Sequence, residues 1–486
     1  MRFVLLLTRV WRRWPGAAAW SAAVRNRMRL IAGIALLACW GASGCCWAQA
    51  ATPQSPPAQQ SPATMPAQAP PAAPPQTSGG AHRLTMPQNP SVVITLDQAI
   101  ELAKKNNPSL QAQRTQIMQN KEQEVTANLR PNPALSWDAE YLPIFDPHLF
   151  SSEYMDNTAE FDAGLGYLFE RGQKRQHRLQ AAKDFTSVTE SQVLDAERDV
   201  VADTGQQFVA VLLAKSNYEF AEQLLKTYQQ TVGVSQEQQK AGAISKSDLL
   251  KIQLQTLQFQ TDVTTAKIAV LQALNSLRQL LGFDSVPRDY DVSGSLAYEP
   301  INLTVDDLRA RALNNRPDLQ AAERSITAAQ SQIGLAKANS KQDLNATFDY
   351  SHVNASNLAA FYFSIPLPIF NRNQGEVART YYALTQSKFL AEAARQQVLT
   401  DVKNGYENLL SSEEVIELYN GGYLQQAKQS LEIAQFAYQH GAASLLDFLD
   451  AERSYRATEL SYRQSVAAYM SALEQLRAAV GTRDLR

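Results

Sequence analysis

The sequence predicts a mainly α-helical protein with a small β part, built as a duplicated unit of long helical hairpins and four antiparallel strands. Residues 95–141 recur at 304–350 with a constant offset of 209, and three further positions recur with an offset of 199. Long-period self-similarity indicates repeated architecture, so we divide the body into a first repeat, 93–300, and a second repeat, 301–486. The matched positions are Thr95/Thr304, Asp97/Asp306, Asn106/Asn315, Pro108/Pro317, Leu110/Leu319, Gln111/Gln320, Ala112/Ala321, Tyr141/Tyr350, Gly242/Gly441, Asp248/Asp447 and Gly282/Gly481.

The N-terminal 92 residues differ in composition from the repeats. Residues 1–50 predict a signal peptide region, with a basic start at Met28 and Arg29, an apolar core at 30–37 and a small-residue cleavage site at 48–50. The alternative is a retained membrane anchor, but the apolar core is about half of the ~20 residues that a spanning helix needs. Residues 51–92 are rich in Pro, Ala and Gln, which predicts an extended linker.

Cysteine usage and charge narrow the compartment and the partners. All three cysteines lie within the first 50 residues, so no disulfide is expected in the body. Residues 42–45 resemble a lipidation motif ending at Cys45, and Cys39 ends a second partial match; lipidation and simple cleavage after Ala50 remain alternatives. Beyond residue 50 the chain has 38 basic against 47 acidic groups, which argues against a nucleic-acid partner.

Each repeat is expected to open with a capped helix that is interrupted early. Thr95 and Gln98 have capping-box spacing, and Thr304 stands in the same place with Asp307 as a weaker third residue. Helical character continues to about residue 128 in the first repeat and to about 338 in the second. Pro108 and Pro317 predict a kink near each start.

Four short segments alternate apolar and polar residues and end in aromatic residues, which predicts strands with one apolar face. These segments are 135–141, 161–167, 344–350 and 359–370. A membrane-spanning sheet must close on itself because lipid offers no partner for edge hydrogen bonds. Since the smallest outer-membrane barrels have eight strands, four strands cannot close alone, and a lipid-embedded sheet would require several chains.

Two long helices follow the strand pairs. Residues 173–239 contain no proline or strong breaker, which gives 67 residues or about 100 Å of helix. Residues 376–439 repeat this with 64 residues, about 96 Å. The shorter helices 98–128 and 247–281 are expected to stack end to end and match one long helix.

The helix 247–281 carries two apolar tracks, as a helix with neighbours on both sides would. A plain helical bundle explains the same periodicity. One track holds Val263, Val270, Leu274, Leu277 and Leu281; the other holds Leu250, Leu254, Leu257, Ile268 and Leu271.

Five motifs in this duplicated frame resemble the TolC-type outer-membrane efflux family, in particular its cobalt–zinc–cadmium type cation-efflux branch, over about residues 93–482. The motifs are LRPNP at 129–133, FERGQKR at 169–175, PLPIFNRNQG at 366–375, GAISKSDLL at 242–250 and its echo at 441–449. The resemblance implies a homotrimer whose twelve-stranded barrel in outer-membrane lipid continues into a periplasmic α-helical barrel. It implies a passive exit duct that docks with a periplasmic adaptor and an inner-membrane RND transporter, without a cofactor.

The resemblance also implies roles for particular residues. The two helix–helix turns resemble periplasmic tips that meet the adaptor, although an ordinary hairpin turn explains the same residues; they are Gly242, Ala243, Ile244, Ser245, Gly441, Ala442, Ala443 and Ser444. Asp447 and Asp450 match acidic residues that ring the pore constriction, while Asp447 also suits the first turn of a helix. Tyr438 and Asp248 match a gate pair at the closed tip. The arginine expected beside them is replaced by Ala443, so the sequence does not identify the contact that closes the tip.

Enzyme signatures are lacking in the sequence. The five histidines are scattered without metal-ligand spacing, and neither a phosphate loop nor a nucleophile elbow is present. We therefore expect no catalytic, metal or cofactor site. Metal cations are the expected cargo, with organic solutes or type I secretion as the alternative. A periplasmic coiled-coil scaffold or adaptor protein is the alternative of another class.

Overall fold

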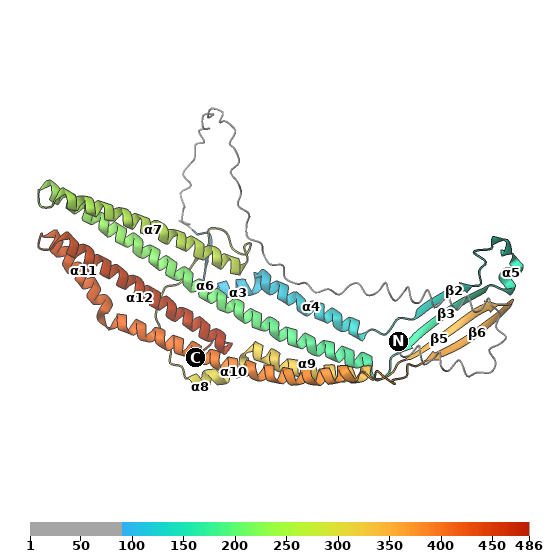
Figure 1. Ribbon diagram of the computed structural model, residues 1–486. Helices are drawn as coiled ribbons and strands as arrows, with labels where there is room; N and C mark the ends of the chain where they lie inside the picture. The colour runs from blue at the N-terminus through green and yellow to red at the C-terminus, as the bar shows by residue number, and fades with distance from the viewer. Residues whose placement is uncertain (1–89, 486) are drawn as a thin grey trace, which may run out of the picture. The chain divides into compact units, whose positions relative to one another are not determined.

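The computed structural model describes residues 90–485 of the chain. The signal peptide region, most of the linker, and Cys39 and Cys45 lie outside the described residues. Figure 1 shows a four-stranded sheet at one end of the described part, with long helices running from it to two helical turns at the other end. The mainly helical architecture with a small antiparallel sheet agrees with the sequence-based prediction.

The same order of elements occurs twice along the chain. The first series is β1 (Val93–Ile94), α3 (Leu96–Asn106), α4 (Pro108–Asn128), β2 (Ala134–Glu140), a 3₁₀ turn (Pro147–Leu149), α5 (Ser152–Asn157), β3 (Glu160–Phe169), α6 (Lys174–Lys240) and α7 (Lys246–Leu281). The second series is β4 (Asp291–Val292), α8 (Val305–Asn315), α9 (Pro317–Asn339), β5 (Leu344–Val353), β6 (Ser356–Ser364), α10 (Gln374–Leu418), a π-helical turn (Tyr419–Tyr423), α11 (Leu424–Gln439) and α12 (Leu445–Val480).

The capped helix starts form in one repeat and not in the other. The Thr95 hydroxyl accepts the backbone N–H of Gln98, and the Gln98 side chain accepts the N–H of Thr95 at 3.0 Å, so the predicted capping box is present. Thr304 makes no side-chain cap, so the capping box expected there is wrong. Its hydroxyl instead donates to the Asp307 carboxylate at 2.8 Å, and this side-chain contact takes the place of the expected cap.

Both predicted proline kinks are present, and each is tied to the end of a long helix. At the first kink Asn107 caps α4 by accepting from Leu110 N at 3.1 Å, and its amide donates to the carbonyl of Leu280 at 3.0 Å. At the second kink Arg316 donates to the carbonyl of Ala479 at 3.2 Å. The kink places α4, and not the whole of 98–128, at the end of α7. The end-to-end arrangement expected for 98–128 and 247–281 therefore involves only α4, since α3 packs beside α6 and α7.

The first long helix is continuous and the second is broken. α6 has 67 residues, as predicted from the lack of breakers. The helix predicted over 376–439 is interrupted by the π-helical turn Tyr419–Tyr423, where Gly422 adopts a φ of 123°. This φ favours glycine because a Cβ disfavours positive values. The adjacent Gly421 and Gly422 are thus the physical reason for the break.

The sheet has the order β2-β3-β5-β6 and is antiparallel throughout. Three strands occur where the alternation predicts them. The fourth, predicted over 359–370, is shifted toward the N-terminus, because Pro366 and Pro368 cannot donate to a ladder. A separate parallel pair joins β1 to β4 and ties the start of the first repeat to the segment that follows α7.

The helices form four columns side by side. α6 packs against α7 and α4 on one side and against α12 and α9 on the other, and α10 and α11 pack against the α12–α9 column. Figure 1 shows this order at the tips as α7, α6, α12 and α11. Three apolar clusters hold the columns together: one in each repeat and one near the tips. The α7–α4 and α10–α11 columns are the two edges of this wall.

Candidate functional site: the helical tips and the open edges

The turn between α6 and α7 is built by a glycine and a serine. Gly242 has a φ of 75°, in the left-handed region that closes helices, and Ala243 N donates to the carbonyl of Gln238 at 2.8 Å. Ser245 then caps α7, with its hydroxyl accepting the N–H of Asp248 at 3.0 Å. The local geometry predicted for this tip is present, with Ile244 and Ser245 partly or fully exposed.

The turn between α11 and α12 repeats the same solution. Gly441 has a φ of 70°, and Ala442 N donates to the carbonyl of Ala437 at 2.7 Å. Ser444 caps α12 in a full capping box with Asp447. The amide of Gln238 donates to the carbonyl of Gln439 at 2.8 Å, so the two tips end at the same level.

An aromatic column joins the two hairpins just behind the tips. Tyr438 of α11 and Tyr228 of α6 both stack on Phe448 of α12, with ring centroids 5.5 and 6.2 Å away. Tyr228 also contacts Phe259 of α7 at 4.7 Å. All four rings are at most 5% exposed. This core could not be predicted from the sequence, because its members come from four separate helices.

The two predicted gate residues occupy different surroundings. Tyr438 belongs to the aromatic column, and its buried hydroxyl has no hydrogen-bond partner among residues 90–485. Asp248 accepts from the Ser245 hydroxyl at 2.8 Å and from Lys251 at 3.3 Å. These hydrogen bonds, that of Ser245 foremost, lower the pKa of Asp248. Within residues 90–485 of one chain the two residues do not contact each other, so the gate pair stays a prediction.

The two predicted pore residues lie one turn apart on α12. The Asp447 carboxylate accepts from the backbone N–H of Ser444 at 3.1 Å and from its hydroxyl at 2.7 Å. The hydroxyl contact, followed by the backbone contact, lowers the pKa of Asp447. Asp450 is exposed. Asp447 therefore has a structural task as a cap, and the pore role of both residues stays a prediction.

The core near the tips also contains a buried carboxylate, that of Glu452, which was not predicted from the sequence. The Glu452 side chain is 6% exposed, and its nearest cation is Arg456, with 3.9 Å between Nε and Oε1. Arg456 is itself bound to Asp262 of α7 at 2.7 Å and lies over the Phe259 ring. Burial raises the pKa of Glu452. The only sequence signal was the four-residue spacing of Glu452 and Arg456 on one helix face.

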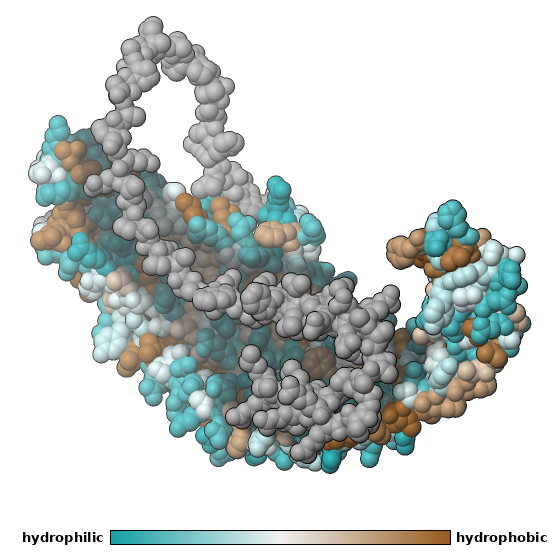
Figure 2. Space-filling view, turned by 45° about the vertical axis from the view of Figure 1, so that its right-hand side comes forward, coloured by the Kyte–Doolittle hydropathy of each residue, from teal (hydrophilic) through white to brown (hydrophobic). Residues whose placement is uncertain are grey.

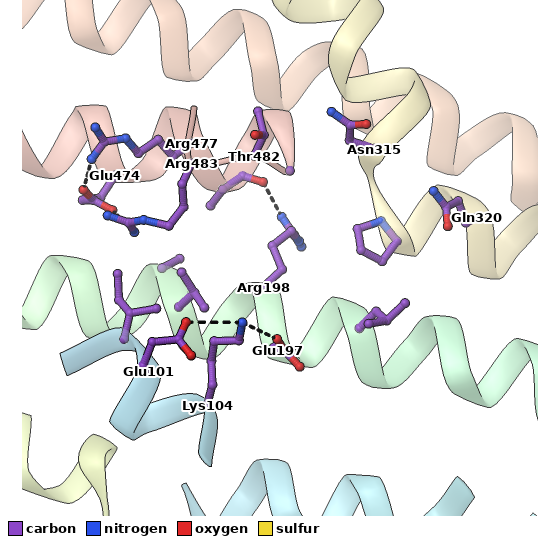
Figure 3. Close-up of a pocket in the computed structure, with 17 residues that line it drawn as sticks. Glu101, Lys104, Glu197, Arg198, Asn315, Gln320, Glu474, Arg477, Thr482 and Arg483 are labelled. Atoms are coloured by element: carbon purple, nitrogen blue, oxygen red, sulfur yellow. Dashed lines mark hydrogen bonds and ion pairs between the residues drawn. The ribbon is translucent and has the colours of Figure 1, made fainter. Parts of the chain in front are cut away.

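A cavity of about 400 Å³ lies between α3, α6, the α8–α9 kink and the end of α12. Figure 3 shows charged side chains around it that bind one another. Lys104 lies 3.1 Å from Glu197, and Arg198 donates to the carbonyl of Ala478 at 2.9 Å. Glu474 is buried and accepts from Arg477 and from Arg483, the latter at 3.2 Å. The Lys104–Glu197 ion pair ties α3 to α6, and the Arg198–Ala478 hydrogen bond ties α6 to the end of α12.

Within 90–485 no group of three or more His, Cys, Asp or Glu side chains is arranged to hold a metal ion.

Within residues 90–485, no helix combines the length and the apolar character that a helix needs to cross a bilayer.

Exposed apolar side chains gather on the sheet and on the two edge columns. On the sheet they include Leu135, Trp137, Leu165, Leu358, Phe361 and Phe363, each more than half exposed, and Figure 2 shows hydrophobic patches at this end. On the α4–α7 column they are Met118, Val125, Leu250, Leu254, Leu257 and Ile268; on the α10–α11 column they include Tyr382, Phe389, Leu390, Leu418, Ile433 and Phe436. From Leu250 to Ile268, the predicted second track of α7 therefore lacks a neighbour among residues 90–485.

The family described as "Outer membrane efflux protein" matches residues 99–283 and 308–482, more than half of the chain. The chain belongs to the outer membrane efflux protein family. The resemblance drawn from the sequence is confirmed. This efflux protein is a transport protein of the outer membrane with a periplasmic extension, and it is not an enzyme.

Relatives of this efflux protein come from several bacteria. It is 23% identical over 385 residues to the cobalt-zinc-cadmium resistance protein CzcC of Cupriavidus metallidurans, covering 77% of this chain and 87% of that one. It is 27% identical over 332 residues to the cation efflux system protein CusC of Escherichia coli, covering 64% and 71%. It is 25% identical over 315 residues to the toluene efflux pump outer membrane protein TtgC of Pseudomonas putida, covering 61% and 64%.

Solved structures share the fold of this efflux protein. A crystal structure of CusC matches with a TM-score of 0.63 at 22% identity, over 83% of this chain and 96% of that one. The outer membrane protein VceC of Vibrio cholerae matches with a TM-score of 0.62 at 20% identity, over 80% and 96%. The predicted fold class is confirmed.

Proposed function

We propose that three copies of this chain form the outer-membrane exit duct of a tripartite RND-type efflux pump. The observation that carries the proposal is the pair of open edges. β2 and β6 are the sheet edges, and they connect to the helical edge columns through α4 and α10. One edge of the wall thus continues from α7 and α4 into β2, and the other from β6 into α10 and α11.

Two different edges on one chain favour a ring of identical copies. A head-to-tail contact between unlike edges generates a closed ring when the rotation closes. Closure would pair β2 of one copy with β6 of the next, which satisfies the hydrogen-bond demand of a sheet in lipid. Three copies give twelve strands, above the eight of the smallest outer-membrane barrels.

Single-channel recording tests the duct itself. Purified full-length protein in a planar bilayer should give discrete conductance steps, and its mass in detergent should correspond to three chains. A preparation that is monomeric in detergent, or a correctly assembled trimer without conductance, contradicts the proposal.

The cargo we propose is metal cations. The support is that two relatives are named for cobalt, zinc and cadmium resistance and for cation efflux. Organic solutes are the second candidate, because another relative is named for toluene efflux. A deletion strain should become sensitive to zinc, cobalt, cadmium or copper, and complementation should restore growth. Sensitivity to toluene and dyes alone would instead indicate that organic solutes are the cargo.

We also propose that Asp447 and Asp450 line the pore constriction at the periplasmic tip. Rings of Asp447 and Asp450 would favour cations over anions at the periplasmic end, which is supported by the lowered pKa of Asp447 and the exposure of Asp450. Asp450→Asn should reduce cation selectivity measured from the reversal potential in a salt gradient, with Glu237→Gln, an exposed acidic residue near the other tip, as the control. An unchanged reversal potential in Asp450→Asn argues against the ring.

The turns at 242–245 and 441–444 are the proposed docking site of the periplasmic adaptor. Cysteines introduced at Ala243 and Ala442, labelled with a photo-cross-linker in cells, should capture the adaptor, whereas a label at Phe389 should not.

The proposal also includes the division of the chain predicted from the sequence. Its parts are the signal region 1–50 with candidate lipidation at Cys45 or Cys39, the linker 51–92, and the repeats 93–300 and 301–486. Metabolic labelling with palmitate separates lipidation from cleavage after Ala50.

A further inference from the structure

Each of the four connections between a long helix and the sheet carries a basic residue. Arg130 lies between α4 and β2, and Arg171 lies between β3 and α6. Lys341 lies between α9 and β5, and Arg372 lies between β6 and α10. Figure 1 shows all four connections at the same end of the sheet. We call this level of the molecule the junction.

The sheet beyond the junction lacks positive side chains. Residues 131–170 and 342–371, which include the four strands, contain acidic residues but no Lys or Arg. The positive charge nearest to the sheet is therefore concentrated at the junction, and the basic residues there are not part of a uniformly basic surface.

A cavity of about 240 Å³ lies at the junction, beside the start of α6. Its helix side is charged, and its sheet side is aromatic. The lining includes Arg130, Tyr167, Phe169, Glu170, Lys174 and Arg175.

The carboxylate and the lysine of this lining are already paired within the chain. Glu170 lies 2.8 Å from the guanidinium of Arg178. Lys174 lies 2.7 Å from the carboxylate of Asp343. These two ion pairs leave no carboxylate in the lining to neutralise its arginines.

The two arginines of the lining have no partner of their own. Among residues 90–485, the guanidinium groups of Arg130 and Arg175 form neither an ion pair nor a hydrogen bond. Gln173, which precedes α6, makes no side-chain cap either, so no side chain offsets the positive end of the helix dipole. The cavity thus holds uncompensated positive charge, which favours an anionic ligand.

The aromatic side of the cavity belongs to the apolar face of the sheet. Leu165 pairs directly with Leu135. Because alternate residues of a strand share a face, Tyr167 and Phe169 lie on the face of Leu165. Their rings contact edge to face at 4.8 Å, and Phe169 is 49% exposed. The cavity therefore lies where the apolar face ends and the basic groups begin.

We propose that this cavity binds the phosphate head group of an anionic phospholipid from the periplasmic leaflet of the outer membrane. Arg130 and Arg175 bind the phosphate oxygens, because guanidinium groups match phosphate in a forked geometry. The acyl chains lie along Phe169 and the apolar face beyond it. The bound lipid fixes the height of the sheet in the membrane. This inference rests on the proposed placement of the sheet in outer-membrane lipid.

Native mass spectrometry of the full-length protein in a non-ionic detergent tests the site. The probes are phosphatidylglycerol, phosphatidylcholine and inorganic phosphate. Phosphatidylglycerol should bind at least about fivefold more tightly than phosphatidylcholine, because basic residues near a membrane surface attract anionic lipids. Inorganic phosphate at millimolar concentration should not displace the lipid, since it has no acyl chains to contact Phe169.

Substitutions locate the binding to the two arginines. Arg130→Gln combined with Arg175→Gln should weaken phosphatidylglycerol binding by about tenfold or more. Arg130→Lys combined with Arg175→Lys keeps the charge and should lose clearly less. Lys428→Gln is the matched control, because Lys428 is an exposed lysine of α11 about 80 Å along α10 and α11 from the junction. Its affinity for the lipid should equal that of the native protein.

Three results overturn the site: equal affinity for the two lipids, native affinity in the Arg→Gln pair, or an equal loss in Lys428→Gln. Displacement of the lipid by millimolar inorganic phosphate indicates a site for free phosphate and also overturns the proposal.

The outcomes are separable from those of the proposed function. The cavity is formed within one chain, so the lipid preference is measured in a monomer as well as in a trimer. A conducting trimer without the preference overturns the site and leaves the duct intact. A monomer that prefers phosphatidylglycerol supports the site and contradicts the duct.

Discussion

The packing of α6 on α12 depends on the absence of a side chain at Gly205. A Cβ at this position would lie 2.6 Å from Oε2 of Glu474 and 3.0 Å from its Cδ. Glu474 is 3% exposed and accepts from both Arg477 and Arg483. Its carboxylate therefore cannot move away from an alanine without leaving two guanidinium groups less well paired.

The expected cost of Gly205→Ala follows from three opposing contributions. Overpacking in a close-packed interior costs about 1–3 kcal/mol. Weakening a buried ion pair adds to this, up to about 3 kcal/mol if one partner is fully lost. The higher helix propensity of alanine opposes this loss and stabilises the helix by about 1 kcal/mol relative to glycine. Together these contributions give a fall in the free energy of unfolding between about 0 and 5 kcal/mol, with about 2–3 kcal/mol as the central expectation.

Gly233 offers a control in the same helix. A Cβ there meets nothing within 4 Å, so Gly233→Ala should raise the free energy of unfolding by up to about 1 kcal/mol through helix propensity alone. Unfolding is followed by far-ultraviolet circular dichroism in detergent, with heat or denaturant, at several scan rates. The double variant Gly205→Ala with Glu474→Ala completes the test, since the alanine at 205 should cost less once the carboxylate is gone.

Two results would refute this reasoning. One is a Gly205→Ala variant as stable as Gly233→Ala. The other is an equal cost of Gly205→Ala in the presence and absence of the Glu474 side chain, because coupling between contacting residues is what the double-mutant cycle measures.

Three further predictions follow from the tip core and the helix caps. Phe448→Ala removes the ring between Tyr228 and Tyr438 and should lower the free energy of unfolding by about 3–5 kcal/mol; a loss below about 1 kcal/mol in thermal unfolding contradicts the aromatic column. Burial raises the pKa of Glu452, so its contribution to stability is fully present below its ordinary value of 4.5 and is lost as the pH rises through the raised pKa. Glu452→Gln should therefore unfold at a higher temperature than the native protein at pH 8, with the difference vanishing near pH 4; a constant difference across that range argues against the burial. Thr95→Ala should cost about 1 kcal/mol and Thr304→Ala less than about 0.5, because only Thr95 makes a side-chain cap; equal melting shifts would contradict this.

The sequence predicted those features that depend on neighbouring residues. α6 was predicted because nothing between its ends opposes a helix, and both proline kinks and both glycine–serine turns follow from local backbone rules. The break at Gly421 and Gly422 was missed. Each glycine costs a helix only about 1 kcal/mol, so whether the pair opens into a π-helical turn depends on how α10 and α11 pack against α12.

The candidate site was predicted only where its geometry is local. The caps of Ser245 and Ser444 were expected and are present. The burial of Tyr438 between α11 and α12, and the burial of Glu452, depend on contacts between helices far apart in the chain. Periodicity on one helix shows which face is apolar, but it does not show which side chain of another helix covers it.

The joints at Asn107 and Arg316 show how far two copies of an ancestral segment have diverged in chemistry while keeping one connection. In the first, a neutral amide reaches the carbonyl of Leu280; in the second, a guanidinium reaches that of Ala479 and also binds Asp318 and Asp401. Exchanging Asn107 and Arg316 alone would leave Asp318 and Asp401 without their arginine at the second joint and place a cation at the first joint without these two carboxylates. The two joints are thus no longer interchangeable, and Arg316 can change only together with Asp318 and Asp401.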